Sequence, residues 1–161
     1  MIKASVNQIV KKRIRTSQIN VVSSNQEFKV LYVEDDEAQR LLFQKYFSRS
    51  KKVKLLLAYS GFEGIASIVT EKPNLLITDL NMPGIDGFGM ISQLKLHKDF
   101  SNLEIVVLSS MHKQEIDEHG GLPLDIKVFT KPISFKILDE YIDQLITSKN
   151  IDLSPDLAHQ S

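Results

Sequence analysis

Four groups of polar residues in this chain could carry out one reaction if the fold brought them together. They are Glu34-Asp35-Asp36, Asp79, Ser109 and Lys131. Crowded carboxylates repel one another, and a hard divalent cation with oxygen ligands, such as Mg²⁺, relieves that repulsion. A cation and a lysine on opposite sides form a pocket for a phosphoryl group, whose transfer mainly needs positioning and neutralised charge. These residue types therefore predict phosphoryl transfer.

Within such a pocket the residues take different roles. Asp79 is the predicted nucleophile, because a carboxylate can form an acyl phosphate without a general base. The hydroxyl of Ser109 could donate a hydrogen bond to the phosphoryl group, and Asp35 is the predicted metal ligand. The acidic run also fits the start of a helix, where the helix dipole favours carboxylates. That second interpretation is kept for Glu37, and Asp36 is left undecided.

The elements that must position these residues follow from the spacing of the apolar residues. Five short apolar runs predict strands at residues 28–33, 53–58, 75–78, 105–108 and 126–129. Helical spacing between and after them predicts helices at 37–47, 61–70, 87–96, 112–119 and 135–146. The apolar stripes of these helices, which include Leu41, Leu42 and Ile137, are expected to form the core.

Strict alternation of strands and helices predicts an α/β fold, a doubly wound parallel sheet of five strands with five helices on its two faces. Ligands of such three-layer sandwiches bind at the carboxyl ends of the strands. The acidic run follows the first predicted strand, Asp79 the third, Ser109 the fourth and Lys131 the fifth. All four groups are therefore expected at one edge of the sheet.

Charge is distributed unevenly along the 161 residues. Residues 1–26 carry five basic and no acidic side chains, whereas the other 135 carry 15 basic and 20 acidic ones. This step predicts a basic N-terminal extension over 1–26, a domain over 27–149 and a polar tail over 150–161. No DNA-binding or catalytic output domain is expected to fit beside that domain. The extension lacks aromatic residues for stacking on bases, so no direct nucleic-acid binding is expected.

The composition excludes several other classes of protein. There is no cysteine, which excludes disulfides and thiolate catalysis and agrees with a reducing compartment. The longest apolar runs are far too short to cross a bilayer, so no membrane insertion is expected. The N-terminus has no apolar core of signal-peptide length. A cytoplasmic location is the resulting expectation.

Four motifs in order resemble the receiver domains of bacterial two-component response regulators. They are VLYVEDD at 30–36, LLITDLNMPGIDG at 75–87, VVLSS at 106–110 and FTKP at 129–132. The separations are also typical of the family: 44 residues from Asp35 to Asp79, 30 from there to Ser109 and 22 more to Lys131. The resemblance covers about three-quarters of the chain, roughly residues 28–148, and implies the flavodoxin-like receiver fold.

The resemblance also implies a role for each matching position. Asp79 would accept a phosphoryl group from a sensor histidine kinase, and Lys131 would pair with it at rest. Asp35 would bind Mg²⁺ directly and Glu34 through water, and the backbone carbonyl of Asn81 would be a third protein ligand. Ser109 would move inward to contact the phosphoryl group. Lys131 and Pro132 would be joined by the cis peptide bond often seen in the family.

One position departs from the family pattern. Receivers often have an aromatic switch residue three positions before the lysine, but here Val128 stands there. The neighbouring Phe129 should point to the opposite face of its strand, because side chains alternate along a strand. How this chain would report its phosphorylation is therefore open.

Taken together, these features predict a stand-alone, chemotaxis-regulator-like response regulator. Its expected partners are a sensor histidine kinase or histidine phosphotransfer protein and an unidentified effector protein, and a homodimer is left open. It is not expected to be an enzyme beyond its own phosphorylation and dephosphorylation. One alternative is a phosphorelay intermediate or phosphate sink that passes the group to a histidine phosphotransfer protein. A second alternative, an aspartyl-phosphate hydrolase, is disfavoured because Asn81 stands where such enzymes have an acid/base Asp.

Overall fold

The computed structural model describes residues 27–152, and its centre is a single sheet of five parallel strands. The spatial order of the strands is β2-β1-β3-β4-β5. Their bounds are β1 (Phe28–Val33), β2 (Val53–Ala58), β3 (Leu75–Thr78), β4 (Glu104–Ser109) and β5 (Lys127–Thr130). The predicted doubly wound parallel sheet is thus confirmed, with strand ends shifted by one residue at most.

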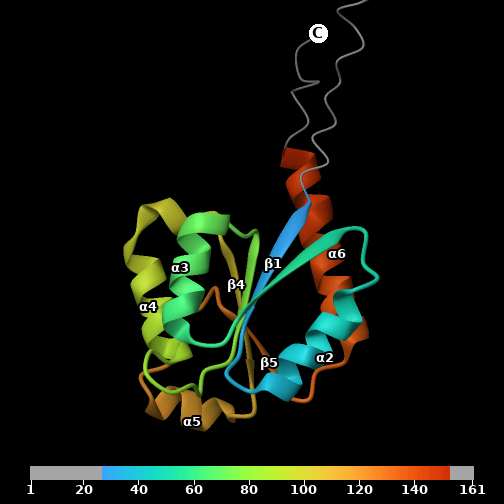
Figure 1. Ribbon diagram of the computed structural model, residues 1–161. Coiled ribbons are helices and arrows are strands. Elements are labelled where there is room, and N and C mark those ends of the chain that lie inside the picture. The colour runs from blue at the N-terminus through green and yellow to red at the C-terminus, as the bar shows by residue number, and fades with distance from the viewer. Residues whose placement is uncertain (1–26, 153–161) are drawn as a thin grey trace, which may run out of the picture.

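Five α-helices cover the two faces of this sheet. They are α2 (Glu37–Phe47), α3 (Gly61–Glu71), α4 (Gly87–Leu96), α5 (Lys113–Glu118) and α6 (Phe135–Asp152). A 3₁₀ turn, η1 (Lys98–Phe100), follows α4. Helices α2 and α6 lie on one side of the sheet, and α3 and α4 lie on the other with α5 below them (Figure 1). The molecule is therefore the predicted three-layer sandwich.

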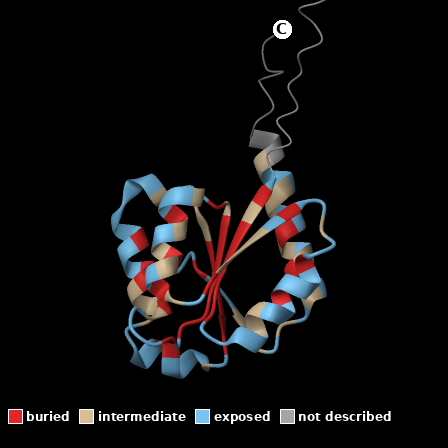
Figure 2. Ribbon diagram, viewed as in Figure 1, coloured by how far each residue is buried: buried red, intermediate tan, exposed pale blue. Residues whose placement is uncertain are grey.

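The three central strands, β1, β3 and β4, are buried on both faces of the sheet, and each face has its own apolar cluster (Figure 2). On the side of α3 and α4, alternate strand residues such as Leu31 and Leu76 pack against Met90 and Ile91. On the side of α2 and α6, the other strand residues pack against helix residues that include Phe43. Strands buried on both faces become continuous apolar runs, which is why β3 is LLIT.

Side-chain caps determine where three of the helices begin. Asp36 accepts a hydrogen bond from the backbone N–H of Gln39, and Asp86 accepts one from Gly89. Ser60 does the same for α3. Each cap satisfies a backbone donor that the first helical turn leaves without a partner. The helix interpretation of Asp36 is therefore correct, and α2 starts immediately after the acidic run.

The core differs from the sequence prediction on several helix faces, those of α2 and α6 among them. Leu41 and Leu42 are exposed, because α2 presents Phe43 and Phe47 to the sheet instead. Phe43 and Phe47 are four positions apart and therefore lie on one helix face. Ile137 is exposed for the same reason, since Leu138 defines the inward face of α6.

Helix α6 is also longer than predicted. It continues from Phe135 to Asp152, six residues beyond the predicted end at Ile146. No glycine or proline lies between Ile146 and Pro155, so the sequence contains no residue that would stop the helix earlier. The predicted extension over residues 1–26 and the tail residues 153–161 lie outside the described residues.

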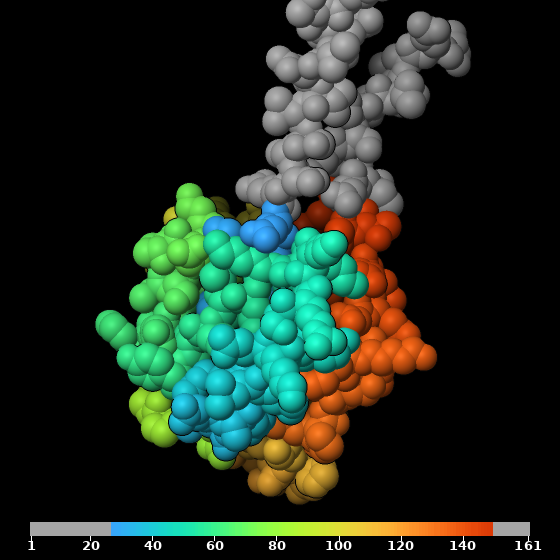
Figure 3. Space-filling view, turned by 45° about the vertical axis from the view of Figure 1, so that its right-hand side comes forward, coloured from blue at the N-terminus to red at the C-terminus, as the bar shows by residue number. Residues whose placement is uncertain are grey.

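Helices α2 and α6 lie side by side along one flank of the molecule (Figure 3). The ring of Tyr46 stacks on Phe135 with 4.1 Å between ring centroids, and its hydroxyl bonds to Asp139. Lys52, in the loop after α2, forms an ion pair with Asp143. The start of α6 is thereby tied to the end of α2.

Among the described residues, no helix combines the length and the apolar character that a membrane span requires.

Candidate functional site

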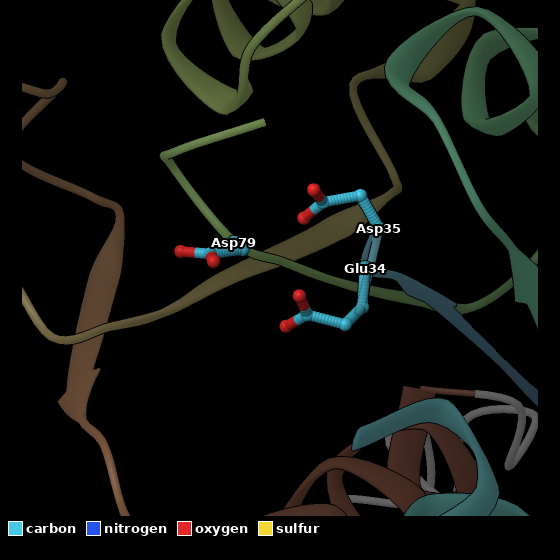
Figure 4. Close-up of side chains that lie close together, drawn as sticks. All are labelled: Glu34, Asp35 and Asp79. Atoms are coloured by element: carbon cyan, nitrogen blue, oxygen red, sulfur yellow. The ribbon is translucent and has the colours of Figure 1, made fainter. Parts of the chain in front are cut away.

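Three carboxylates meet where β1 and β3 end. Glu34 and Asp35 follow β1, Asp79 follows β3, and one oxygen of each lies within 4.8 Å of the others. In Figure 4 the side chains of Glu34 and Asp35 reach from the end of β1 toward Asp79. The parallel pairing of β1 with β3 creates this approach, since Val33 lies opposite Thr78 and the acidic residues follow directly. The predicted convergence of the acidic residues is confirmed.

Asp79 is nearly buried, with 9% of its surface exposed, and both of its carboxylate oxygens have partners. Its Oδ1 accepts a hydrogen bond of 2.7 Å from the backbone N–H of Leu80 and a longer one of 3.4 Å from Asn81. Its Oδ2 accepts one of 2.9 Å from the ammonium of Lys131. These bonds hold the carboxylate in one orientation at the mouth of the site.

Glu34 is the most buried member of the cluster, with 1% of its surface exposed. Its Oε2 accepts hydrogen bonds from Lys131 Nζ at 2.7 Å and from the hydroxyl of Tyr32 at 3.0 Å. Its Oε1 accepts one from the backbone N–H of Asp36 at 3.2 Å. Lys131 therefore bridges Glu34 and Asp79, whereas the sequence led us to expect a pair with Asp79 alone.

Burial opposes the charge of Lys131, but hydrogen bonds to Glu34 and Asp79 outweigh it and raise the pKa of the ammonium above its ordinary value. The phenol of Tyr32 is shifted in the same direction, because burial and then the charge of Glu34 raise its pKa. Both groups therefore keep their protons near neutral pH and act as donors to the carboxylates.

The donor set fits a hard divalent cation. Three carboxylates with one ammonium leave two uncompensated negative charges, and oxygen atoms are the ligands that Mg²⁺ prefers. Asp35 is exposed, so its carboxylate can reach a cation without losing a buried partner. Oε2 of Glu34 already has two donors, which makes Glu34 the less suitable direct ligand.

Two residues outside the predicted site hold its backbone in place. Arg40 of α2 donates hydrogen bonds of 2.7 Å to the carbonyls of Glu34 and Asp35. Gly87, the first residue of α4, passes so close to Asp79 that a Cβ atom there would lie 2.2 Å from the Asp79 carbonyl oxygen. A larger residue would have to push α4 or the Asp79 backbone aside.

Comparison with known proteins decides the family. The model of the response regulator receiver domain matches residues 30–143. This chain belongs to the response regulator receiver domain family. A solved structure has the same fold. The signal receiver domain of a signal transduction histidine kinase from Syntrophus aciditrophicus superposes with a TM-score of 0.66 at 19% sequence identity. The superposition covers 83% of this chain and 97% of that domain.

Two curated relatives show how far the similarity extends. The receiver is 28% identical over 114 residues to the transcriptional regulatory protein AfsQ1 of Streptomyces coelicolor, covering 70% of this chain but only 48% of that protein. It is 22% identical over 126 residues to the sporulation initiation phosphotransferase F of Bacillus subtilis, covering 76% of this chain and 96% of that protein. It thus spans about half of the first relative and nearly all of the second.

The remaining predicted site residues of this receiver are Ser109, Asn81 and the Lys131-Pro132 pair. Ser109 ends β4, is buried, and accepts a hydrogen bond of 3.1 Å from the N–H of Met111 through its Oγ. Asn81 follows Asp79 by two residues and is exposed. The peptide bond between Lys131 and Pro132 is cis, as the resemblance implied.

The residue at the usual position of the aromatic switch is Val128, which is not aromatic. Val128 is 40% exposed, while Phe129 packs on the other face of the sheet, where its ring meets Tyr141 edge to face at a centroid distance of 5.7 Å. The predicted alternation of these two side chains is confirmed. Phe129 therefore cannot replace the missing aromatic residue on the face of Val128.

Sequence reasoning missed two residues that contact the site. Tyr32 could have been found, because residues two apart on a strand share a face and Tyr32 therefore lies beside Glu34. For Arg40 the sequence carries no comparable signal, since an arginine in the first turns of a helix is ordinary. Its contact depends on how α2 is oriented over the end of β1.

Proposed function

We propose that the chain accepts a phosphoryl group on Asp79 from a phosphohistidine of a sensor histidine kinase or histidine phosphotransfer protein, in a Mg²⁺-dependent reaction. Receiver domains as a family are phosphorylated by histidine kinases and typically use Mg²⁺ at an acidic pocket. The observation that supports Asp79 as the acceptor is its pairing with Lys131 beside two further carboxylates.

The metal would be held by Asp35, Asp79 and the backbone carbonyl of Asn81, with Glu34 contacting it through water. Bound there, Mg²⁺ supplies positive charge that offsets the negative charge of the phosphoryl oxygens. The donor set carries this assignment, since Glu34 is already occupied by Lys131 and Tyr32 while Asp35 is exposed.

The chain's own residues then perform the transfer. A carboxylate oxygen of Asp79 forms a bond to phosphorus, and the phosphorus–nitrogen bond of the phosphohistidine breaks with its electron pair returning to the imidazole. Lys131 stays protonated and offsets the charge of the phosphoryl oxygens from the side of β5. The hydroxyl of Ser109, once turned from Met111, donates a hydrogen bond to one of those oxygens.

The output is a change in a protein-binding surface rather than turnover of a substrate. The surface we propose consists of α5, β5 and α6, next to Ser109 and Lys131, and its partner is an effector protein. Phosphorylation can favour one state of this surface only through contacts that differ between the states. A stand-alone, cytoplasmic signalling role without nucleic-acid binding remains part of this proposal, and a homodimer is left open.

Phosphorylation with a small donor tests the proposal. With acetyl phosphate and Mg²⁺, one phosphoryl group per chain should be incorporated, because the small donor replaces the kinase. Asp79→Asn should abolish it, since an amide has no carboxylate to form the acyl phosphate. Chelation of Mg²⁺ should have the same effect. Full labelling of the Asn variant at another residue would refute the assignment of Asp79.

One comparison favours a second role, that of a phosphorelay intermediate. The sporulation initiation phosphotransferase F of Bacillus subtilis is covered over 96% of its length, so the match is a whole receiver of similar size. Rapid transfer of the phosphoryl group from Asp79 to a histidine phosphotransfer domain, faster than its hydrolysis, would select this role over effector binding.

A further inference from the structure

We propose that Tyr32 is a positioning residue for the phosphorylation of Asp79. Its buried hydroxyl shares the Glu34 carboxylate with Lys131 and so leaves the lysine free to pair with Asp79. This inference rests on the proposed function of Asp79. It assigns a role in the reaction to a residue that contacts neither the phosphoryl group nor the acceptor itself.

The packing around Tyr32 gives its hydroxyl a single direction. Tyr32 is completely buried in β1, and its ring stacks on Phe43 of α2 with 3.8 Å between centroids and 17° between planes. Glu34 directly follows β1 and is two residues from Tyr32, so the two side chains point to the same face of the extended chain. A buried phenol needs a partner for its hydroxyl, and the partner here is Oε2 of Glu34 at 3.0 Å.

The same oxygen of Glu34 receives the lysine. Lys131 Nζ lies 2.7 Å from Oε2 of Glu34 and 2.9 Å from Oδ2 of Asp79. The ammonium is therefore almost equally close to the two carboxylates. Its position depends on how strongly each carboxylate attracts it. The Tyr32 hydroxyl satisfies part of the hydrogen-bonding capacity of Glu34 and thereby weakens the pull from that side.

Loss of the Tyr32 hydroxyl should therefore move the Lys131 ammonium toward Glu34. Without the Tyr32 hydroxyl, the buried carboxylate of Glu34 keeps two donors, the backbone N–H of Asp36 and the ammonium of Lys131. A carboxylate away from water attracts its remaining donors more strongly. Lys131 would be drawn toward Glu34 and away from the oxygens of the incoming phosphoryl group, and the transfer would slow.

The test compares two tyrosine variants that each lose one hydrogen bond to a glutamate. Tyr32→Phe keeps the ring that stacks on Phe43. Tyr141→Phe is the matched control, because Tyr141 donates a hydrogen bond of 2.6 Å to Glu104 away from the acidic cluster. We expect Tyr32→Phe to lower the rate constant for phosphorylation at saturating Mg²⁺ about three- to tenfold, which corresponds to the net free energy of one typical hydrogen bond. Tyr141→Phe should leave it unchanged.

A second readout does not depend on phosphorylation. The side-chain ammonium signal of Lys131 in nitrogen-15 NMR, assigned through Lys131→Arg, should shift in Tyr32→Phe and stay in place in Tyr141→Phe. An unmoved Lys131 signal, or a Tyr32→Phe rate within about twofold of the wild type, shows that Tyr32 only fills the core. If the wild type itself fails to label on Asp79 while the signal shifts, the proposed function fails and the hydrogen-bonded arrangement stands.

A double-mutant cycle tests whether Tyr32 acts through Glu34. Glu34→Gln keeps the size of the side chain but removes its charge, and it should also shift the Lys131 signal. If the path is Tyr32 to Glu34 to Lys131, adding Tyr32→Phe to Glu34→Gln should change the rate no further. Fully additive effects of the two substitutions, or a Lys131 signal unmoved by Glu34→Gln, would contradict the inference.

Discussion

At the scale of single residues, the site is an arrangement of charges in which Lys131 is the shared cation. It pairs with a buried carboxylate, Glu34, and with a nearly buried one, Asp79. Removal of one partner from a buried pair leaves the other charge without compensation, which costs more than the pair itself contributes. The lysine therefore has a structural role in addition to its proposed role in the reaction.

Lys131→Met should consequently destabilise the fold in the absence of Mg²⁺. We expect the free energy of unfolding in urea, measured with chelator, to fall by about 3 kcal/mol, the lower end of the cost of removing one partner from a buried ion pair, because the acidic cluster loses its counter-charge. The control is Lys136→Met, since Lys136 is 84% exposed and 4.0 Å from Glu140, and it should change stability by less than about 0.5 kcal/mol. Equal stability of the two variants would show that the cluster tolerates an unpaired Glu34.

The pH dependence of this contribution has a definite sign. The folded state raises the pKa of Lys131 above its ordinary value of 10.5. A group of this kind stabilises the fold fully below its unfolded pKa, and the stabilisation is lost as the pH rises through the folded pKa. The difference between wild type and Lys131→Met should therefore be constant around neutral pH and shrink only in strongly alkaline solution.

At the scale of elements, the site depends on how closely α4 approaches the end of β3. Asp86 caps α4, and Gly87 N donates a hydrogen bond of 3.1 Å to the carbonyl of Leu80. The buried side chains of Leu80 and Met82 hold the connecting loop against the core. The Asp-Gly pair of the second motif, Asp86-Gly87, thus helps to support Asp79.

A pair of alanine substitutions in α4 measures this support. Gly87→Ala places a Cβ 2.2 Å from the carbonyl oxygen of Asp79, so we expect it to reduce the free energy of unfolding by about 1–3 kcal/mol, the usual cost of overpacking. Gly89→Ala is the control in the same helix, because its new Cβ meets side-chain atoms rather than backbone, Asp86 Oδ1 at 3.3 Å and Ile85 Cγ2 at 3.7 Å. Its stability should stay within about 1 kcal/mol of the wild type, since alanine also favours the helix.

Phosphorylation provides a second measurement on the same two variants. Gly87→Ala should also slow phosphorylation, because the clash is with the backbone of Asp79, the proposed acceptor. Gly89→Ala should not. Equal stability and equal phosphorylation of both variants would show that α4 can move away without disturbing Asp79.

At the scale of the whole molecule, the parallel sheet gathers like charges at one edge. Three carboxylates within 4.8 Å of one another oppose folding unless a cation is bound, so a cation should stabilise the entire domain. A ligand that binds only the folded state stabilises it by mass action, by about 2.7 kcal/mol at a hundred times its dissociation constant. The function of the site and the stability of the fold are therefore linked.

Thermal unfolding with and without Mg²⁺ measures this linkage. The wild type should unfold at a higher temperature with saturating Mg²⁺ than with chelator. Asp35→Asn should lose that gain, because Asp35 is the proposed direct ligand. Without metal it should be at least as stable as the wild type, since it removes one repelling charge. The control Asp99→Asn, in the exposed turn η1, should retain the gain. A full gain in Asp35→Asn would contradict its proposed role.

Most of the fold could be predicted from the chain alone. The apolar runs are short and continuous, as buried parallel strands require. The ranges of β1, β2 and β3 were therefore predicted exactly, and those of β4 and β5 differ from the prediction by one residue at each end. The inward helix faces were predicted less well. Leu41 and Leu42 have helical spacing but stay exposed, because the stacking of Phe43 on Tyr32 determines which face of α2 meets the sheet.

The sequence by itself determined which residues gather at the site, because parallel strands bring their carboxyl ends to one edge and each motif follows a strand. Beyond the expected pair of Lys131 with Asp79, only the tertiary structure decided how their hydrogen bonds are shared. Lys131 is shared between Glu34 and Asp79, and Tyr32 and Arg40 support Glu34 and Asp35. Those contacts join residues up to 97 positions apart. They depend on side-chain directions within a packed core, which strand order and spacing do not specify.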